Sequence, residues 1–308
     1  MTGNTLALVF PGQGSQKVGM LAEIAQAFPV IEQTFAEASE AIGYDMWDRV
    51  QNGEQELLNL TEHTQPLLLT ASVALWRVWQ QNNGAMPAFM AGHSLGEFSA
   101  LVCADCMDFS DAVTLVRDRG RFMQSAVPVG EGSMAAILGL DDATIIEICA
   151  ATGAEAVNFN SPGQVVIAGR VAAVDLAIEQ LKAAGAKRAM GLPVSAPFHT
   201  SMMRPAGVKL AEKIAGLTLK SPSVPVVHNV NASTESDPEA IKNLLVQQIS
   251  SPVNWVGCVQ TMLDNGIEQT LECGPGKVLS GLSKRIHKPL LTFNIDSVDG
   301  LEKALAGQ

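Results

Sequence analysis

A pentapeptide of the pattern G-x-S-x-G, Gly92-His-Ser-Leu-Gly96, is the stretch of this sequence with the clearest capacity for chemistry. Glycines two residues before and after a serine are typical of a nucleophile elbow, a turn so tight that larger side chains there would collide with the backbone. At such a turn the hydroxyl of Ser94 stands at the start of a helix, where unpaired N–H groups can stabilise an oxyanion. The pattern predicts ester hydrolysis or acyl transfer and does not by itself distinguish them.

A serine hydroxyl is a weak nucleophile and needs a base. The chain has five histidines, namely His63, His93, His199, His228 and His287. His93 adjoins Ser94 on the elbow, so its side chain diverges from the hydroxyl, and the first and last of the five lie in polar stretches typical of solvated positions. His199 is favoured because it follows the serine in a proline-bounded loop at a strand end, the chain order of α/β-hydrolase sites. His228 remains the alternative base.

The residues around the pentapeptide predict the strand and helix that an elbow requires. Residues 88–91 are typical of the end of a buried strand, and residues 95–104 are compatible with a helix. The apolar run Leu6–Phe10 predicts a central parallel strand buried on both faces. It leads into a glycine-rich loop, Pro11–Gln16. Because loops at the carboxyl ends of parallel strands line the ligand crevice, Gln13 is a candidate site residue.

Most of the remaining chain alternates between predicted helices and short strands. Helices are predicted over 30–41, 64–82, 111–125, 203–215, 240–249 and 254–265 and after the turn 274–277, and strands over 224–229, 269–273 and 293–295. One of these helices carries Arg117, Arg119 and Arg121. Since only positions three or four apart share a helix face, at most one or two of these arginines can point into a crevice.

A change in composition at 127–132 predicts a linker to a second structural unit. The sequence then predicts a strand at 133–139, a helix at 141–152, a hairpin at 156–168, a helix at 171–184 and a strand at 188–194. The order βαββαβ is the ferredoxin-like pattern. We therefore predict an α/β fold: a hydrolase-like core with a mostly parallel sheet, formed by residues 1–126 and 197–308, and an inserted ferredoxin-like subdomain formed by residues 127–196.

The overall composition excludes some classes of protein. Of 308 residues, 47% are hydrophobic and 17% charged, and the formal net charge is −11. This excludes a disordered chain and disfavours non-specific nucleic-acid binding, which requires an excess of Lys and Arg. The segment Met1–Thr5 lacks a basic region and the apolar stretch 66–76 is too short to span a membrane, so we expect a soluble cytoplasmic protein.

Three further patterns do not predict a cofactor or metal site. Gly12 and Gly14 lack the third glycine of a dinucleotide-binding loop, and the turn 274–277 lacks the residues of a Walker loop. Cys103 and Cys106 have C-x-x-C spacing, but no second pair accompanies them. We expect them to be small buried side chains rather than a redox or zinc site.

Five segments, taken together, resemble the motifs of the malonyl-CoA:acyl carrier protein transacylases, free-standing acyltransferases of bacterial fatty acid synthesis. They are Phe10-Pro-Gly-Gln-Gly-Ser-Gln16, Gly92-His-Ser-Leu-Gly-Glu97, Arg119-Gly-Arg-Phe-Met-Gln124, Asn158-Phe-Asn-Ser-Pro-Gly-Gln164 and Glu272-Cys-Gly-Pro-Gly276. The resemblance runs from Leu6 to about Ile286, and several motifs in order are more specific than any one of them. It implies a hydrolase-like α/β core with an inserted ferredoxin-like subdomain, the same division as above.

The resemblance also implies roles for single residues. Ser94 would be the nucleophile and His199 the base. The backbone N–H groups of Gln13 and Leu95 would form the oxyanion hole. Arg119 would bind the malonyl carboxylate.

Three more residues receive roles in the same way. The backbone carbonyl of Gln248 would orient the histidine and replace the usual triad aspartate. Asn160 would lie near the coenzyme A or pantetheine. Phe198, immediately before the histidine, would exclude α-branched acyl groups by its bulk.

The implied reaction is ping-pong transfer of malonyl from malonyl-CoA to the pantetheine thiol of acyl carrier protein, through an ester on Ser94. No cofactor or metal is expected, since the coenzyme A thioester is a substrate. The expected partners are malonyl-CoA and acyl carrier protein, with no nucleic acid and no membrane, and the chain is expected to be a monomer. Lys187-Arg188 and Lys284-Arg285 with Lys288 are the candidate clusters for docking an acidic carrier protein.

Two alternatives remain. A serine esterase or thioesterase would use Ser94 and His199 with water as acceptor. Arg119 and the lack of a credible triad acid argue against it. A non-catalytic, carrier-binding scaffold is the second alternative, and the glycines on both sides of the serine argue against it, because a scaffold has no need of a strained elbow.

Overall fold

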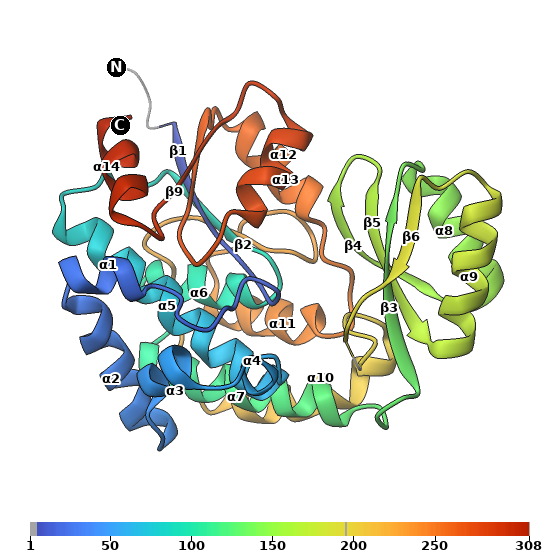
Figure 1. The fold of residues 1–308 in the computed structure, drawn as a ribbon, viewed down its shortest axis with the longest axis horizontal. Helices are drawn as coiled ribbons and strands as arrows, with labels where there is room; N and C mark the ends of the chain where they lie inside the picture. The colour runs from blue at the N-terminus through green and yellow to red at the C-terminus, as the bar shows by residue number, and fades with distance from the viewer. Residues whose placement is uncertain (1–4, 195, 308) are drawn as a thin grey trace.

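The computed structural model of the chain describes residues 5–194 and 196–307 (Figure 1). Its larger part is built on a five-stranded sheet made of β1 (Leu6–Phe10), β2 (Phe89–Gly92), β7 (Val226–Val227), β8 (Gln269–Glu272) and β9 (Leu291–Asn294). The strand order is β7-β2-β1-β8-β9, and every neighbouring pair is parallel. The carboxyl ends of the central strands therefore open onto one edge of the sheet, where ligands of such folds bind.

The central strand β1 is buried on both faces because it is apolar at every position. Leu6, Leu8 and Phe10 belong to the larger hydrophobic core, whereas Ala7 and Val9 belong to a second core on the other face. This alternation follows from the two-residue period of a strand.

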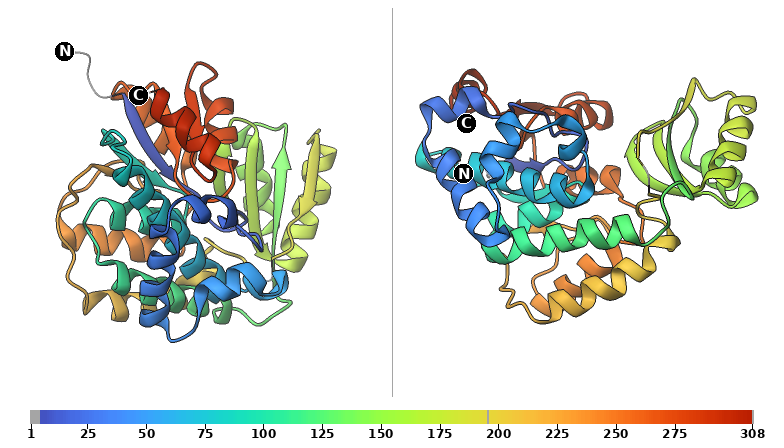
Figure 2. Two further views of the ribbon diagram at one scale, coloured as in Figure 1. Left: turned by 60° about the vertical axis from the view of Figure 1, so that its left-hand side comes forward. Right: turned by 60° about the horizontal axis from the view of Figure 1, so that its bottom comes forward.

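Helices cover both faces of the large sheet (Figures 1 and 2). Before the insertion they are α1 (Ala22–Ala27), α2 (Val30–Ile42), α3 (Met46–Asn52), α4 (Gln55–Leu58), α5 (Thr61–Gln81), α6 (Leu95–Cys103) and α7 (Phe109–Ser125). After it come a 3₁₀ turn (Ser201–Met203), α10 (Arg204–Ala215), α11 (Pro238–Gln248), α12 (Trp255–Asp264), α13 (Val278–Ile286) and α14 (Val298–Ala306). Residues of α5 and α6 fill the larger core, and residues of α12 and α13 fill the second.

A separate four-stranded sheet forms the smaller part. Its elements are β3 (Gly132–Leu138), α8 (Asp142–Thr152), β4 (Glu155–Ser161), β5 (Gln164–Arg170), α9 (Val171–Ala183) and β6 (Arg188–Gly191). The strands are antiparallel in the order β4-β5-β3-β6. Helices α8 and α9 cover the outer face (Figure 1), while Met134, Val157 and Val166 on the opposite face join the larger core.

The predicted fold class, a mostly parallel sheet with a βαββαβ unit, is confirmed. Two predicted strands are shorter than expected. β6 ends at Gly191, just before Pro193, which has no N–H to donate to a ladder. β7 ends at Val227 because the backbone N–H of Asn229 is bonded to a side chain of α6 and not to a strand. Helix α14 was not predicted.

No helix of the described chain combines the length and apolar character needed to cross a membrane. Of the segment Met1–Thr5, from which no targeting signal is expected, only Thr5 lies within the described residues. Ser195, four positions before His199 in the sequence, also lies outside them.

Candidate active site

The elbow around Ser94 connects β2 to α6. Ser94 has φ 51° and ψ −105°, a backbone conformation that residues other than glycine rarely adopt. A Cβ on Gly92 would lie 1.8 Å from the carbonyl carbon of Gly96, and one on Gly96 would lie 2.0 Å from the carbonyl oxygen of Phe10. Neither position can therefore hold any residue but glycine. The serine side chain makes no capping bond to the helix, so its hydroxyl is available for chemistry.

His199 lies directly beside the serine hydroxyl. Its Nε2 is 2.8 Å from Ser94 Oγ, and its Nδ1 is 2.9 Å from the backbone carbonyl oxygen of Gln248. A carbonyl only accepts hydrogen bonds, so Nδ1 carries the proton and Nε2 is free to accept the proton of the serine. This is the geometry of a nucleophile and its base, with a carbonyl in the place of a triad carboxylate.

The surroundings keep this imidazole uncharged. Burial, together with the positive charge of Arg119, lowers the pKa of His199 from 6.5 to about 3. At neutral pH the ring is therefore neutral and able to accept a proton. A transient imidazolium would receive no help from a neighbouring carboxylate, so it returns its proton readily to a leaving group.

Arg119, on α7, is fully buried beside the same serine. Its guanidinium donates to Gln65 Oε1 at 2.7 Å, to Gln248 Oε1 at 2.9 Å and to Ser94 Oγ at 3.1 Å, and its Nε has no partner among the described residues. All three acceptors are neutral. Burial lowers the pKa of Arg119 to about 10, which still leaves it charged at neutral pH.

Close helix packing brings Arg119 to this position. At Gly120 a Cβ would lie 2.6 Å from the carbonyl oxygen of Thr61, so glycine allows α7 to lie against the start of α5. Gln65 on α5 can then reach the guanidinium. Of the three arginines predicted on this helix, Arg117 is half-buried and Arg121 is exposed, and both pair with Asp118. Only Arg119 faces the site, as the helical spacing predicted.

Two backbone N–H groups near the hydroxyl have no acceptor among the described residues. One belongs to Leu95, the first residue of α6, and the other to Gln13, in the loop after β1. A Cβ on Gly12 would lie 2.6 Å from the carbonyl oxygen of His93, so this loop lies against the elbow. Free N–H groups at such a place are suited to stabilise an oxyanion.

The other predicted site residues border this centre. His93 Nε2 donates to Oδ1 of Asn160, on β4, at 2.8 Å, which joins the elbow to the small sheet. Phe198 is buried next to the base. His228 does not contact the serine. His63, expected to be solvated, is instead half-buried against Arg49 and Tyr44.

The sequence did not predict a role in the site for Gln65, Glu97 or Asn229. It predicted His228 only as an alternative base, and the structure shows it as the buried partner of an acid. Asn229 Oδ1 accepts the backbone N–H of Ser94 at 2.7 Å, and its Nδ2 donates to the carbonyl of Gly92 at 2.7 Å. The available signal was that Glu97 is the one charged residue in the mostly apolar helix α6.

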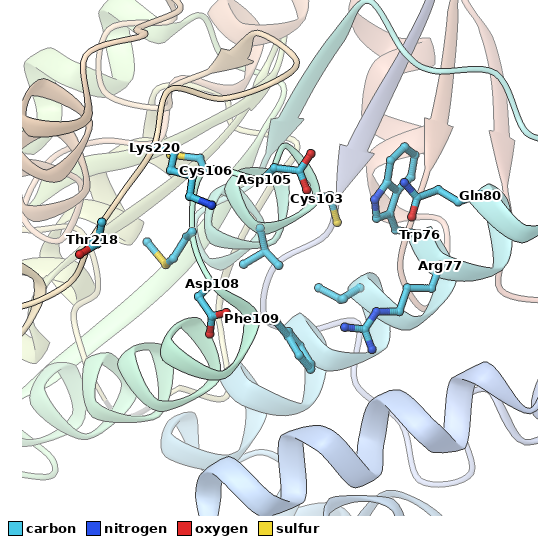
Figure 3. Close-up of a pocket in the computed structure, with 13 residues that line it drawn as sticks. Trp76, Arg77, Gln80, Cys103, Asp105, Cys106, Asp108, Phe109, Thr218 and Lys220 are labelled. Carbon is cyan, nitrogen blue, oxygen red and sulfur yellow. The ribbon is translucent and has the colours of Figure 1, made fainter.

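A cavity of about 330 Å³ lies at the opposite end of α6 (Figure 3). Trp76, Arg77, Cys103 and Lys220 are among its lining residues, which do not include Ser94 or His199. Since α6 rises about 1.5 Å per residue, its two ends are about 12 Å apart. The cavity is therefore separate from the catalytic centre.

The cysteines are all buried and unpaired. Burial raises the pKa of each thiol, which disfavours the thiolate that redox or metal chemistry requires. Within residues 5–194 and 196–307 there is no group of three or more His, Cys, Asp or Glu side chains that could hold a metal ion.

Comparisons with known proteins show the family to which the chain belongs. A family model described as "Acyl transferase domain" matches residues 7–288. The malonyl CoA-acyl carrier protein transacylase of Salmonella typhimurium is 57% identical over 303 residues, covering 97% of this chain and 98% of the relative.

Solved structures are equally similar. An acyl carrier protein S-malonyltransferase from Vibrio cholerae superposes with a TM-score of 0.96 at 53% identity, covering 97% of this chain and 99% of that one. A malonyl-transacylase solved in complex with a type II PKS acyl-carrier protein superposes with a TM-score of 0.97 at 52% identity, covering 98% and 99%.

Proposed function

Because the chain belongs to the acyl transferase family, we propose that it transfers a malonyl group from malonyl-CoA to acyl carrier protein in fatty acid synthesis, through an ester on Ser94. The observation that carries this proposal is a buried, charged Arg119 that touches the nucleophile and has only neutral partners. The negative charge of Glu97 acts on Arg119 but its carboxylate does not bond the guanidinium, and a substrate carboxylate in direct contact would offset the cost of burying this cation. Acetyl or longer neutral acyl groups could not do so.

The first half-reaction acylates the serine. His199 Nε2 takes the proton of Ser94 as Oγ attacks the thioester carbonyl of malonyl-CoA. The N–H groups of Gln13 and Leu95 hold the resulting oxyanion, and donors of this kind contribute about 3–4 kcal/mol each in other enzymes. The tetrahedral intermediate collapses, the C–S bond breaks, and His199 gives its proton to the sulfur of coenzyme A.

The second half-reaction reverses these steps with another thiol. His199 accepts the proton of the pantetheine thiol of the carrier protein as the sulfur attacks the malonyl ester. The intermediate collapses, and the proton returns to Ser94 Oγ. Both half-reactions use the same imidazole, which is neutral when it accepts a proton and charged until it returns that proton, and the Gln248 carbonyl holds its Nδ1–H throughout.

Selectivity for malonyl follows from Arg119. The planar guanidinium can pair two N–H groups with a carboxylate, and its Nε–H has no partner among the described residues. Phe198 would limit the space beside the α-carbon of the acyl group. Asn160 would face the pantetheine arm.

The remaining parts of the proposal concern surroundings and partners. We propose that the reaction needs no cofactor or metal, because the residues above supply the base, the oxyanion donors and the carboxylate site. We also propose that the chain acts as a cytoplasmic monomer, without nucleic acid or membrane.

The carrier protein would dock on the two basic clusters. Lys187 packs against Gly139, and the backbone N–H of Gly139 donates to the carbonyl of Gly163. Arg285 donates to the side chain of Gln164, the residue that follows Gly163. Both clusters therefore border one β-turn of the small sheet. Reversing the charges of Lys187 and Arg285 is expected to raise the Michaelis constant for acyl carrier protein by about tenfold and to leave that for malonyl-CoA unchanged. An equal rise for both substrates would contradict docking there.

Mass spectrometry of the intact protein tests the function. Incubation with malonyl-CoA is expected to add one malonyl group, on Ser94, and subsequent acyl carrier protein to remove it. Rapid loss of the adduct in water without carrier protein would instead indicate a thioesterase, and the lack of any adduct would indicate a scaffold. Ser94→Ala is the control and takes up no malonyl.

A further inference from the structure

Glu97 lies three residues after the nucleophile, in the first turn of α6, and is fully buried. A serine followed three residues later by glutamate is the sequence of a capping box, in which the carboxylate returns to the N–H of the serine. Here that N–H is bonded to Asn229 instead. The Glu97 carboxylate is thus directed away from its own helix and into the protein.

Three donors bind this carboxylate. Oε1 accepts from His228 Nδ1 at 2.8 Å, and Oε2 accepts from the backbone N–H of Asn229 at 2.9 Å and from Nε2 of Gln248 at 2.8 Å. The donors come from two segments distant in sequence, 228–229 and α11. Glu97 therefore fixes both segments against the start of α6.

Both of these segments hold the catalytic groups. Asn229 bonds the backbone on each side of the elbow turn, at Ser94 N–H and at the carbonyl of Gly92. Gln248 holds His199 through its carbonyl, donates its amide to the carbonyl of Ser94, and accepts from Arg119. The relative positions of nucleophile, base and carboxylate site thus depend on two residues that share one buried acid.

We propose that Glu97 is a positioning residue for acyl transfer: by anchoring Gln248 and Asn229 together, it sets the distance between the Ser94 hydroxyl and the His199 imidazole. The inference rests on the proposed function for its substrate, but its contacts concern only the protein. What matters is the place of the acceptor oxygens, since the three donors would also bind a neutral acceptor in the same place.

Two substitutions separate position from charge. Glu97→Asp keeps the charge but withdraws the carboxylate by one methylene from all three donors. Glu97→Gln removes the charge but leaves an oxygen within reach of Asn229 and Gln248, while its amide nitrogen faces His228 Nδ1, which can accept in the other tautomer. The structure therefore predicts that the aspartate variant is impaired far more than the glutamine variant.

The measurement is single-turnover acylation of Ser94 by malonyl-CoA and by acetyl-CoA, read by mass spectrometry across donor concentrations. Because a misplacement of about 1 Å can cost about 100-fold in rate, Glu97→Asp is expected to lower the maximal acylation rate by about 10- to 100-fold with both donors. The half-saturating concentration of acetyl-CoA, which does not use the carboxylate site, should stay unchanged. Glu97→Gln should remain within about threefold of the parent.

Glu272 provides a matched control, because it is a second fully buried glutamate that accepts three hydrogen bonds, from Leu279 and Ser280 at the start of α13. Glu272→Asp is expected to lower the thermal midpoint as Glu97→Asp does but to leave acylation by the folded protein within about twofold. Equal loss of acylation in both aspartate variants would show a merely structural role and overturn the proposal. So would wild-type acylation by Glu97→Asp, or a glutamine variant as slow as the aspartate variant.

A fluorophosphonate reagent separates this proposal from the proposed function. It reacts with activated serines whatever their natural acyl donor, so the parent should be labelled at Ser94 and Glu97→Asp should be labelled about 10- to 100-fold more slowly. If the parent reacts with the reagent but never with malonyl-CoA, the proposed substrate fails and the positioning role stands. If the reagent labels Glu97→Asp as fast as the parent, the positioning role fails.

Discussion

His199 and His228 are both buried histidines connected to the Ser94 elbow, yet their surroundings suit them to different work. Nδ1 of His199 bonds a neutral carbonyl, and its Nε2 faces the serine hydroxyl. Nδ1 of His228 bonds the carboxylate of Glu97, and its Nε2 bonds nothing among the described residues. Burial alone therefore does not identify a catalytic base. The partner of each ring nitrogen does.

The charges near the two rings differ as well. Arg119 lies near His199 and helps to lower its pKa, so the ring is kept neutral as a proton acceptor. The buried acid beside His228 instead uses the ring as a hydrogen-bond donor. One region is prepared to exchange a proton with substrate, and the other to hold its neighbours in place.

Replacing each histidine tests this contrast most strongly. His199→Ala is expected to lower acylation of Ser94 by about 10⁴-fold or more, as loss of a serine's base does in other enzymes. His228→Asn removes one hydrogen bond to Glu97 but no reacting group, so a loss of about tenfold or less is expected. Steady-state kinetics with malonyl-CoA and carrier protein measure both. Losses of similar size would show that the two regions are not distinct in role.

Arg119→Met tests whether the guanidinium beside His199 binds the malonyl carboxylate. The variant loses the positive charge that Arg119 offers to the malonyl carboxylate. Breaking such a buried charged contact costs about 3–4 kcal/mol, or about 10²- to 10³-fold in kcat/KM for malonyl-CoA. Acetyl transfer should be equal or faster, because a neutral acyl group makes no use of the guanidinium. Competition between the two thioesters reads the ratio directly, and a parallel loss for both would contradict the carboxylate role.

The pH dependence of acylation gives the smallest effect. Below its pKa, Nε2 of His199 carries a proton and cannot accept one from Ser94, so activity falls as the pH falls through that value. With a pKa of about 3, acylation should not decline on account of this ring between about pH 8 and 5. Arg119→Met removes a positive neighbour, so the pKa rises toward 6.5 and the decline begins at a higher pH.

Acetyl-CoA is the suitable donor for this pH series, since it lacks a titrating carboxylate. His228→Asn serves as the comparison, because Arg119 and the burial of His199 are unchanged in it. If the pH at which acylation declines shifts equally in His228→Asn and Arg119→Met, the titrating group is not His199.

Much of the fold could be predicted from the sequence because its signals are local. The apolar run Leu6–Phe10 specifies a strand buried on both faces, and the order of elements from 132 to 191 specifies the βαββαβ unit. The glycines at 92 and 96 specify a tight turn around Ser94. Strands β6 and β7 were both predicted too long. A proline follows the end of β6, which is a local signal, whereas β7 ends where a side chain from outside the sheet binds the backbone, which depends on tertiary contacts.

The sequence by itself determined the nucleophile, reduced its base to two histidines and favoured His199 of the two from its place in the chain; the resemblance implied the same residue. Only the tertiary structure decided which of them faces the hydroxyl, and it alone showed what Glu97 does. The reason is physical: a turn is specified by residues within a few positions of one another, whereas the contacts of Glu97 with His228 and Gln248 join residues 131 and 151 positions apart. Such contacts form only when packed helices and strands bring distant segments together, and no local pattern records them.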